Sequence, residues 1–320
     1  MESEKKEENA PNNEAAPTLK TKEDNMAKIN NSIKENNGIK EFDLLFLIDA
    51  TGSMGDYIRA AKEESENIST KLRTSYPEYN FQYGYVFYRD PIDSKSDIHE
   101  VINLTDNVNS LPEKIGKIKA QGGGDLPEDW VGAFKLANES ISWRNGIKSI
   151  MHLADAGAHG KEFTLSDKYP EESAKLKDEL MKCAKKNIKI FGYIIAEDAR
   201  NSFNKCQELY KSYGGSYEIC EFPKKEKKRY ARREYKAESI DDVECCCDED
   251  MDCYEREDGY GDKDEDEDEE DDLNERFRDR VLDNVESMLW LIYNNYLYNV
   301  SGIKCLIENK IIIKKLLIWK

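Results

Sequence analysis

Asp43-Leu-Leu-Phe-Leu-Ile-Asp-Ala-Thr-Gly-Ser-Met-Gly-Asp56 is the stretch of this 320-residue chain that decides its fold. Its apolar run, Leu44 to Ile48, has the length of a buried strand, and a strand that is apolar on both sides belongs inside a sheet covered by helices. The run stops at Asp49, glycines turn the chain, and apolar residues then recur at helical spacing. The sequence predicts a strand, a loop and a helix, with the loop at the sheet edge where open α/β sheets bind ligands.

That loop carries three hard oxygen donors in alternation, Asp49, Thr51 and Ser53. The spacing lets one short loop aim a carboxylate and two hydroxyls at one point. Mg²⁺ prefers such oxygens, uses few protein ligands and keeps several waters. The alternative is a polar turn in which Ser53 or Asp56 caps the following helix.

Two further stretches repeat this arrangement. Asp155, in His152-Leu-Ala-Asp-Ala-Gly-Ala-His-Gly160, follows the apolar segment Ile147 to Ala154, so a second strand ends in a carboxylate and a glycine turn. Between the two strands, Gly122-Gly-Gly-Asp-Leu-Pro-Glu-Asp129 leads into a helical pattern and carries Asp125. The sequence therefore has three polar loops, of which the first and the third each follow a predicted strand.

The three loops resemble the metal-ion-dependent adhesion site (MIDAS) of the von Willebrand factor A (VWA) domain, whose first loop reads Asp-x-Ser-x-Ser. The resemblance covers roughly Phe42 to Phe222. With Tyr83-Gly-Tyr-Val-Phe-Tyr-Arg-Asp90, the loops look like those of VWA domains in protist alpha-protein kinases and related intracellular VWA proteins. The family usually supplies a Thr from its second loop, where this chain has Asp125.

The resemblance implies a set of site residues and a mode of action. A bound Mg²⁺ or Mn²⁺ would have an open coordination position, which a partner protein fills with an acidic side chain. His159 and Asp129 are candidates for hydrogen bonds around the ligands, and His152, inside a strand, is interpreted as structural. The implied metal ligands are Asp49, Thr51, Ser53, Asp125 and Asp155.

An enzymatic function is the alternative interpretation. The chain would then be the recruiting part, or a truncated relative, of an alpha-type serine/threonine protein kinase system. A kinase needs a nucleotide-phosphate site and a catalytic carboxylate outside the VWA region, and the sequence has neither a Walker loop nor a nucleophile elbow. We therefore predict no catalytic residues and an interaction module.

Beyond the first strand, helical and strand patterns alternate. This predicts an α/β fold with a mostly parallel central sheet and helices on both faces. The resemblance implies a VWA (Rossmann-like) topology in which Asp97 to Leu104 is an antiparallel edge strand. An amphipathic helix is predicted over Val108 to Lys119.

Charge divides the chain into regions. Positions 238–272 hold 21 acidic and two basic residues, a net charge of −19, whereas the whole chain carries −18. We predict a disordered arm at 1–38, the VWA domain at 39–222, a basic-then-acidic disordered insertion at 223–272, the final VWA helix at 273–295, and a tail at 296–320. An independent tail helix is the alternative for 273–295.

Composition also bears on partners and location. The acidity argues against nucleic-acid binding. The N-terminus lacks the apolar core of a signal peptide, so we expect a cytoplasmic protein whose eight cysteines are thiols, including the cluster Cys245 to Cys247. No run approaches the roughly 18 uncharged residues of a membrane span. The tail is compatible with membrane-surface contact, an added strand or a poorly structured end.

Overall fold

A six-stranded sheet forms the centre of the computed structural model. The structure describes residues 40–90, 98–124, 126–164, 167, 169–221 and 263–301. In the last helix, side chains are described from 272 to 292. The strand order is β3-β2-β1-β4-β5-β6. All neighbouring strands are parallel except β2 and β3, which pair antiparallel. The strands are β1 (Lys40–Asp49), β2 (Tyr79–Tyr88), β3 (His99–Thr105), β4 (Ile147–Ala154), β5 (Ile188–Ile194) and β6 (Ser216–Glu221). This is the predicted fold class, with its antiparallel edge strand.

Strand β1 lies between β2 and β4, and every residue from Phe42 to Asp49 is buried. Its side chains alternate between two apolar cores, with Phe46 in one and Leu47 in the other. A strand with apolar side chains on both faces is stable only where helices cover both, which explains why the unbroken apolar run occupies the middle of the sheet.

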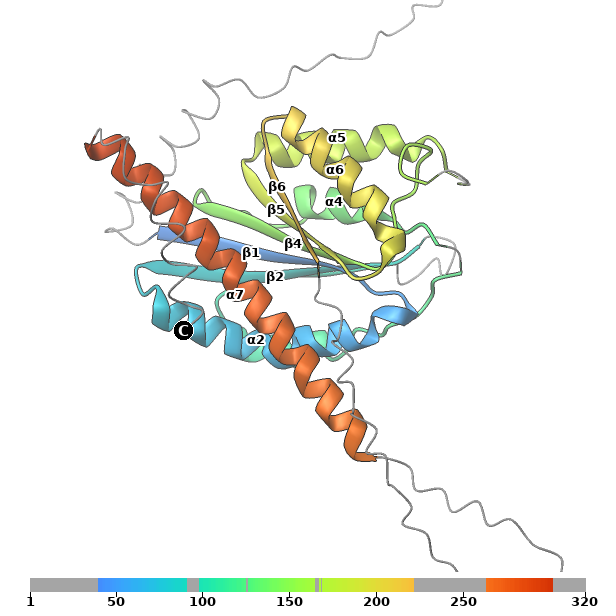
Figure 1. Ribbon diagram of the computed structural model, residues 1–320, viewed down its shortest axis with the longest axis horizontal. Helices are drawn as coiled ribbons and strands as arrows, with labels where there is room; N and C mark the ends of the chain where they lie inside the picture. The colour runs from blue at the N-terminus through green and yellow to red at the C-terminus, as the bar shows by residue number, and fades with distance from the viewer. Residues whose placement is uncertain are drawn as a thin grey trace, which may run out of the picture.

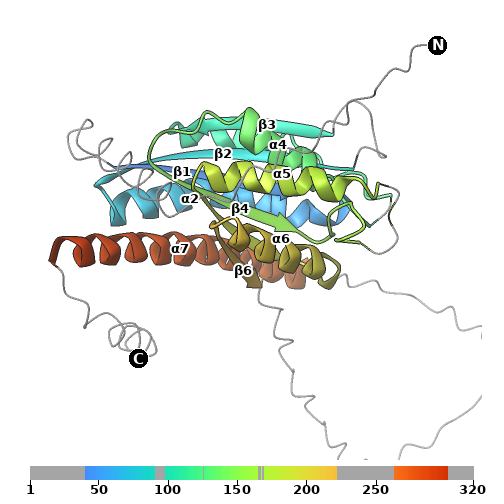
Figure 2. The ribbon, with the colours of Figure 1, turned by 90° about the horizontal axis from the view of Figure 1, so that it is seen from above.

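Helices cover both faces of the sheet (Figures 1 and 2). The core on one face includes residues of α2, α3 and α7, and the core on the other includes residues of α4, α5 and α6. The α-helices are α2 (Gly55–Ser75), α3 (Leu111–Ile115), α4 (Trp130–Glu139), α5 (Glu172–Lys185), α6 (Arg200–Ser212) and α7 (Lys263–Ser301). Short 3₁₀ turns lie at Gly52–Met54, Val108–Ser110 and Glu197–Ala199.

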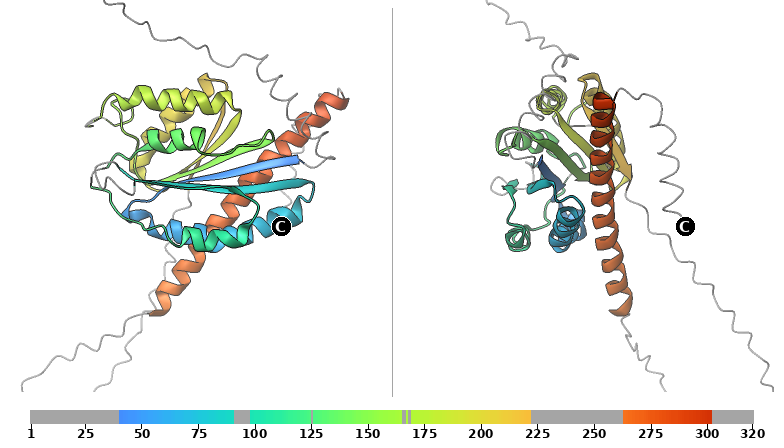
Figure 3. Two further views of the ribbon diagram at one scale, coloured as in Figure 1. Left: turned by 180° about the vertical axis from the view of Figure 1, so that it is seen from behind. Right: turned by 90° about the vertical axis from the view of Figure 1, so that its left-hand side faces the viewer.

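Helix α7 crosses the sheet face beside α2 and extends past the sheet at both ends (Figures 1 and 3). Phe277, Val281 and Val285 are at most 1% exposed, and Arg278 forms an ion pair with Glu64 of α2. The helix begins at Lys263, earlier than the predicted Leu273, within the stretch predicted as a disordered insertion.

The predicted helix over Val108 to Lys119 is wrong in length. The structure has a 3₁₀ turn followed by α3, which ends at Ile115. The reason is local, because Gly116 follows and glycine weakens helix propagation. Leu111 and Ile115 nevertheless face the core.

Several sequence predictions lie outside the described residues. These are the arm at 1–38, the insertion from 223 to 262, the tail beyond 301, Cys245 to Cys247, and Asp125. Among the helices that are described, none combines the length and the apolar character that a membrane crossing requires.

Candidate functional site

The polar loops meet at the carboxyl ends of the parallel strands. Strand β1 ends at Asp49, and Asp155 directly follows β4. Ile48 pairs with Leu153 in the β1–β4 register. Asp49 is the next residue after Ile48, and Asp155 is the second residue after Leu153, so the two carboxylates are offset by one residue on adjacent strands. Neighbouring strands are only about 4.8 Å apart, which brings both side chains to one point of the sheet edge.

Asp49 is fully buried and is oriented by Thr51, itself 2% exposed. The backbone N of Thr51 donates to Oδ1 of Asp49 over 2.9 Å, and the Thr51 hydroxyl donates to the same oxygen over 2.8 Å. The other oxygen, Oδ2, has no hydrogen-bond partner among the residues that the structure describes. A buried carboxylate oxygen without a partner is costly, and a cation is a natural ligand for it.

The electrostatics of Asp49 point the same way. Burial, and secondarily the charge of Asp155, raise the pKa of Asp49 to about 7, although the hydrogen bonds from Thr51 and the charge of Arg89 oppose the rise. Asp155 is half-buried. Two carboxylates held this closely repel each other, and a divalent cation between them would remove that repulsion.

The predicted second loop lies against the first. The backbone N of Gln121 donates to the carbonyl of Ala50 over 3.1 Å, and that of Gly52 donates to the carbonyl of Gly122 over 3.4 Å. Gly122 and Gly123 have φ of 92° and 93°, a region that favours glycine. A Cβ at Gly123 would lie 3.6 Å from the Cβ of Thr51, an ordinary contact distance, so it is the backbone conformation that favours glycine at this position.

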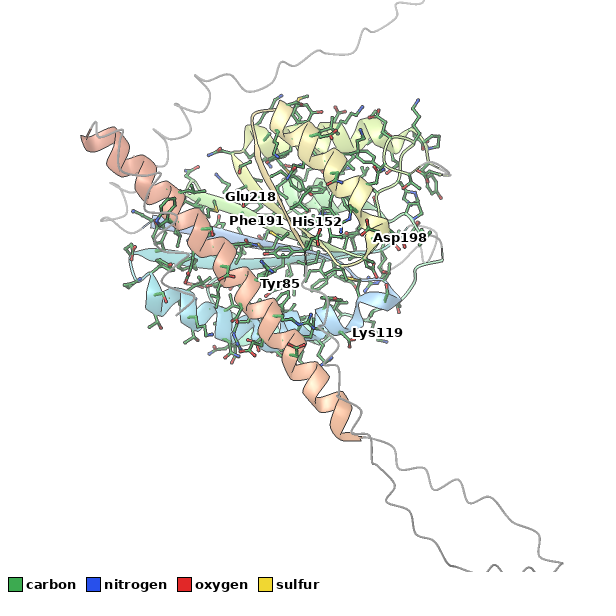
Figure 4. All side chains as sticks on the ribbon, in the orientation of Figure 1. Tyr85, Lys119, His152, Phe191, Asp198 and Glu218 are labelled. Carbon is green, nitrogen blue, oxygen red and sulfur yellow. The ribbon has the colours of Figure 1, made fainter. Side chains whose placement is uncertain are left out.

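Arg89, buried at the end of β2, holds these loops in place. Its guanidinium donates to the carbonyl of Ala50 over 3.1 Å and to that of Lys119 over 2.6 Å, and it pairs with Glu100 of β3 over 2.6 Å. Lys119 and Asp198, both labelled in Figure 4, lie at this end of the sheet. The chain order alone does not reveal these contacts, because the partners of Arg89 come from two separate loops and from β3.

The other predicted residues occupy different positions around the loops. Ser53 is exposed at the surface, in the 3₁₀ turn Gly52–Met54. Asp129 accepts a hydrogen bond from the backbone N of Gly132 over 2.7 Å, which caps α4, and its other oxygen lies 2.8 Å from Nε2 of His99. It thus ties the start of α4 to β3.

His159 lies between two carboxylates, one from the end of β2 and one from its own segment. Its Nε2 lies 2.7 Å from Asp90, and its Nδ1 lies 2.8 Å from Asp167. Burial works against the charged imidazole, but the hydrogen bonds and charges of Asp90 and Asp167 prevail and raise the pKa of His159 to about 9.

His152, labelled in Figure 4, is buried among aromatic rings, in agreement with the structural role that the sequence indicates. Its Nε2 lies 2.8 Å from the hydroxyl of Tyr88, and its ring lies edge-on to Trp130 with centroids 4.4 Å apart. Burial lowers the pKa of His152 to about 3, so the ring is neutral.

These residues determine what the site could bind. Within the described segments, no cluster of three or more His, Cys, Asp or Glu side chains is placed to hold a metal ion. An ion here would rest on Asp49 and Asp155, on the hydroxyls of Thr51 and Ser53, and on water. That oxygen-only donor set fits Mg²⁺ or Mn²⁺ and not a thiolate- or imidazole-bound metal.

Comparison with known proteins agrees with the fold. A family model described as the von Willebrand factor A domain matches residues 43–213. The alpha-protein kinase vwkA of Dictyostelium discoideum is 32% identical over 158 residues, 48% of this chain and 25% of that protein. Human von Willebrand factor A domain-containing protein 7 is 34% identical over 94 residues, 29% of this chain and 10% of that protein.

This chain spans a quarter or less of the length of these two relatives. Among solved structures, the pilus adhesin SpaC of Lactobacillus rhamnosus GG superposes with a TM-score of 0.40 at 14% identity, over 57% of this chain and 28% of that one. The family model covers more than half of the chain and includes the strand that carries Asp49. The chain belongs to the von Willebrand factor A domain family.

Proposed function

We propose that this chain binds a protein partner through a Mg²⁺ or Mn²⁺ ion held by Asp49, Thr51, Ser53 and Asp155. The observation that carries the proposal is the buried Oδ2 of Asp49, which has no hydrogen-bond partner among the described residues although Thr51 holds the carboxylate in a fixed orientation. A cation at this point would satisfy that oxygen and offset the repulsion between Asp49 and Asp155.

The exposure of the ligands favours a bound ion that a partner can reach. Asp49 and Thr51 are buried, whereas Ser53 is exposed, so the ion would lie where the loops meet solvent. Mg²⁺ keeps several waters when it binds few protein ligands, and a carboxylate from a partner can replace one of them. Asp125 belongs to the proposed ligand set from sequence. As a third carboxylate it would neutralise more of the ion's charge and weaken its pull on an acidic partner.

The ion site is tested by calorimetric titration of Mg²⁺ and Mn²⁺ into the full chain and two variants. Asp49→Asn keeps the shape of the side chain but removes its charge, and we expect it to abolish detectable binding while the chain remains folded. Asp56→Asn is the matched control, because Asp56 is an exposed acid on the neighbouring helix, paired only with Arg59 among the described residues. Ion binding by Asp49→Asn at wild-type affinity would refute the site.

A second candidate function rests on the similarity to a relative named as an alpha-protein kinase. In that case the chain would recruit substrates to such a kinase, or take part in phosphate transfer. A phosphotransfer assay with purified chain, radiolabelled ATP and myelin basic protein separates the possibilities. Label transfer that is lost on heat denaturation favours an enzyme, whereas ion binding without transfer favours the interaction module.

A further inference from the structure

Asp90, His159 and Asp167 form a buried network beside the proposed ion site. The His159 side chain is 3% exposed, that of Asp90 is fully buried, and that of Asp167 is 1% exposed. Asp90 lies just beyond the end of β2, whereas His159 and Asp167 belong to the segment between β4 and α5. One imidazole therefore joins two parts of the chain that are 69 residues apart in sequence.

The same segment is held from its other side by backbone contacts. The backbone N of Glu128 donates to the carbonyl of Gly157 over 2.8 Å, and the backbone N of Ala158 donates to the hydroxyl of Ser202 over 2.9 Å. These contacts involve the backbone and not the imidazole, so the orientation of the His159 side chain is determined by the groups that the ring itself contacts. The ring of Tyr169 meets that of His159 edge-on, with centroids 4.9 Å apart, which limits rotation of the imidazole.

Asp167 also contacts the backbone of its own segment. Besides His159, it accepts hydrogen bonds from the backbone N of Gly160 and from that of Tyr169. Gly160 has a φ of 113°, and a Cβ there would collide with Ser173 of α5, so the chain turns tightly at this point. The segment that starts at Asp155 is thus anchored within five residues of that carboxylate.

Because the network is buried, each of its hydrogen bonds contributes strongly to the stability of the segment. Hydrogen bonds between charged groups are stronger away from water, and removal of one partner leaves the other charge buried and unpaired. A protonated imidazole between two carboxylates satisfies all three groups, which agrees with the raised pKa of His159.

We propose that Asp90 and Asp167, acting through His159, are positioning residues that orient the segment after β4 so that Asp155 faces Asp49 across the ion. This inference rests on the proposed function. Asp155 emerges from a strand whose last carbonyl, that of Ala154, accepts a hydrogen bond from Ile195, so the backbone is fixed up to that point. Beyond it, the segment is held by the backbone contacts of Gly157 and Ala158 and by the anchor at His159, which joins it to Asp90 and Asp167.

The test is a double-mutant cycle on the full chain with Mn²⁺ as the probe. His159→Gln, Asp90→Asn and the double variant are compared with wild type in calorimetric titrations at neutral pH, and their melting temperatures are measured with and without Mn²⁺. The matched control is Asp43→Asn, because Asp43 is a buried acid paired with Arg144 from beyond α4 and is remote from the site along β1.

We expect each single variant to weaken Mn²⁺ affinity at least tenfold, and the double variant to weaken it no further than His159→Gln alone, because that change already removes the contact with Asp90. The melting shift given by Mn²⁺ should shrink accordingly. Asp43→Asn should lower the metal-free melting temperature and keep the wild-type affinity.

Three results would overturn the inference, and they are distinguishable. Affinities within twofold of wild type in His159→Gln and Asp90→Asn would remove the positioning role and leave the proposed ion site in place. Failure of the wild-type chain to bind Mn²⁺ would refute the proposed function and this inference together. Equal losses of affinity in the variants and in Asp43→Asn would show that general destabilisation, and not positioning, is responsible.

Discussion

Thr51 donates two hydrogen bonds to a single oxygen of Asp49, one from its backbone N and one from its hydroxyl. Both donors reach Oδ1, so this carboxylate is held by its neighbour two positions along the chain while Oδ2 stays available. The hydroxyl hydrogen of Thr51 is used in this contact, which leaves the lone pairs of Oγ1 for another ligand. The two residues together thus present a carboxylate oxygen and a hydroxyl oxygen to the same point.

Substitution of Thr51 should separate the roles of its hydroxyl and its shape. Thr51→Val keeps the branched side chain but loses a ligand oxygen and a charge-assisted hydrogen bond worth on the order of 1.5–3 kcal/mol. We expect Mn²⁺ affinity to fall by about tenfold or more, since 1.4 kcal/mol corresponds to a factor of about ten. Thr51→Ser, which keeps the hydroxyl, should stay close to wild type in the same titration, and equal losses in both variants would contradict this role.

His152 should make the fold sensitive to acid. Its pKa is about 3 in the folded chain and 6.5 ordinarily, so the folded state favours the neutral ring. The stabilisation is fully present above pH 6.5 and is lost as the pH falls toward 3. Between pH 7 and pH 5 the loss from this group is about 2 kcal/mol, because each pH unit below 6.5 changes the free energy of unfolding by about 1.4 kcal/mol.

Urea unfolding at pH 7 and pH 5 measures this effect. His152→Gln removes the titrating group. The free energy of unfolding of this variant should fall less between pH 7 and pH 5 than that of the wild type, although the variant is less stable at pH 7. His99→Gln is the control, because it leaves the buried imidazole in place and should keep the wild-type loss. If the pH dependence of the His152→Gln variant equals that of the wild type, other groups are responsible for the loss of stability at acidic pH.

Phe277 tests the contribution of α7 to the domain. Its side chain is 1% exposed, and its ring lies 6.1 Å from that of Phe46 in β1, measured between centroids. Phe277→Ala should lower the free energy of unfolding by about 3–5 kcal/mol, the usual effect of deleting a buried aromatic ring. Leu291 lies on the same helix but is 44% exposed, so Leu291→Ala should change stability by only about 0.5 kcal/mol or less. Equal urea midpoints for the two variants would show that α7 is not part of the cooperative unit.

The sequence by itself determined the central architecture, because the signals involved are local. The apolar run from Leu44 to Ile48 and the turn after Asp49 predict a central strand and its loop without knowledge of any partner. The alternation of strands and helices predicts the parallel sheet, and parallel strands place their carboxyl ends at one edge. The position of Asp49 and Asp155 at that edge follows from these local facts.

Local signals were weaker at the ends of helices. The amphipathic pattern of Val108 to Lys119 continues past Gly116, yet α3 ends at Ile115. The charge of the stretch before Leu273 suggested disorder, yet α7 starts at Lys263. Hydrophobic periodicity reports which face of a helix is buried, and it does not report where the backbone stops being helical.

Only the tertiary structure decided which groups hold the site loops together. Arg89 spans the carbonyls of Ala50 and Lys119, and His159 reaches Asp90 across 69 residues of sequence. Such contacts join loops whose relative distance is set by the packing of the sheet and its helices, and no spacing along the chain encodes them. The reason is physical: backbone periodicity is a property of neighbours in sequence, whereas a buried charge is satisfied by whichever partner the fold brings within about 3 Å.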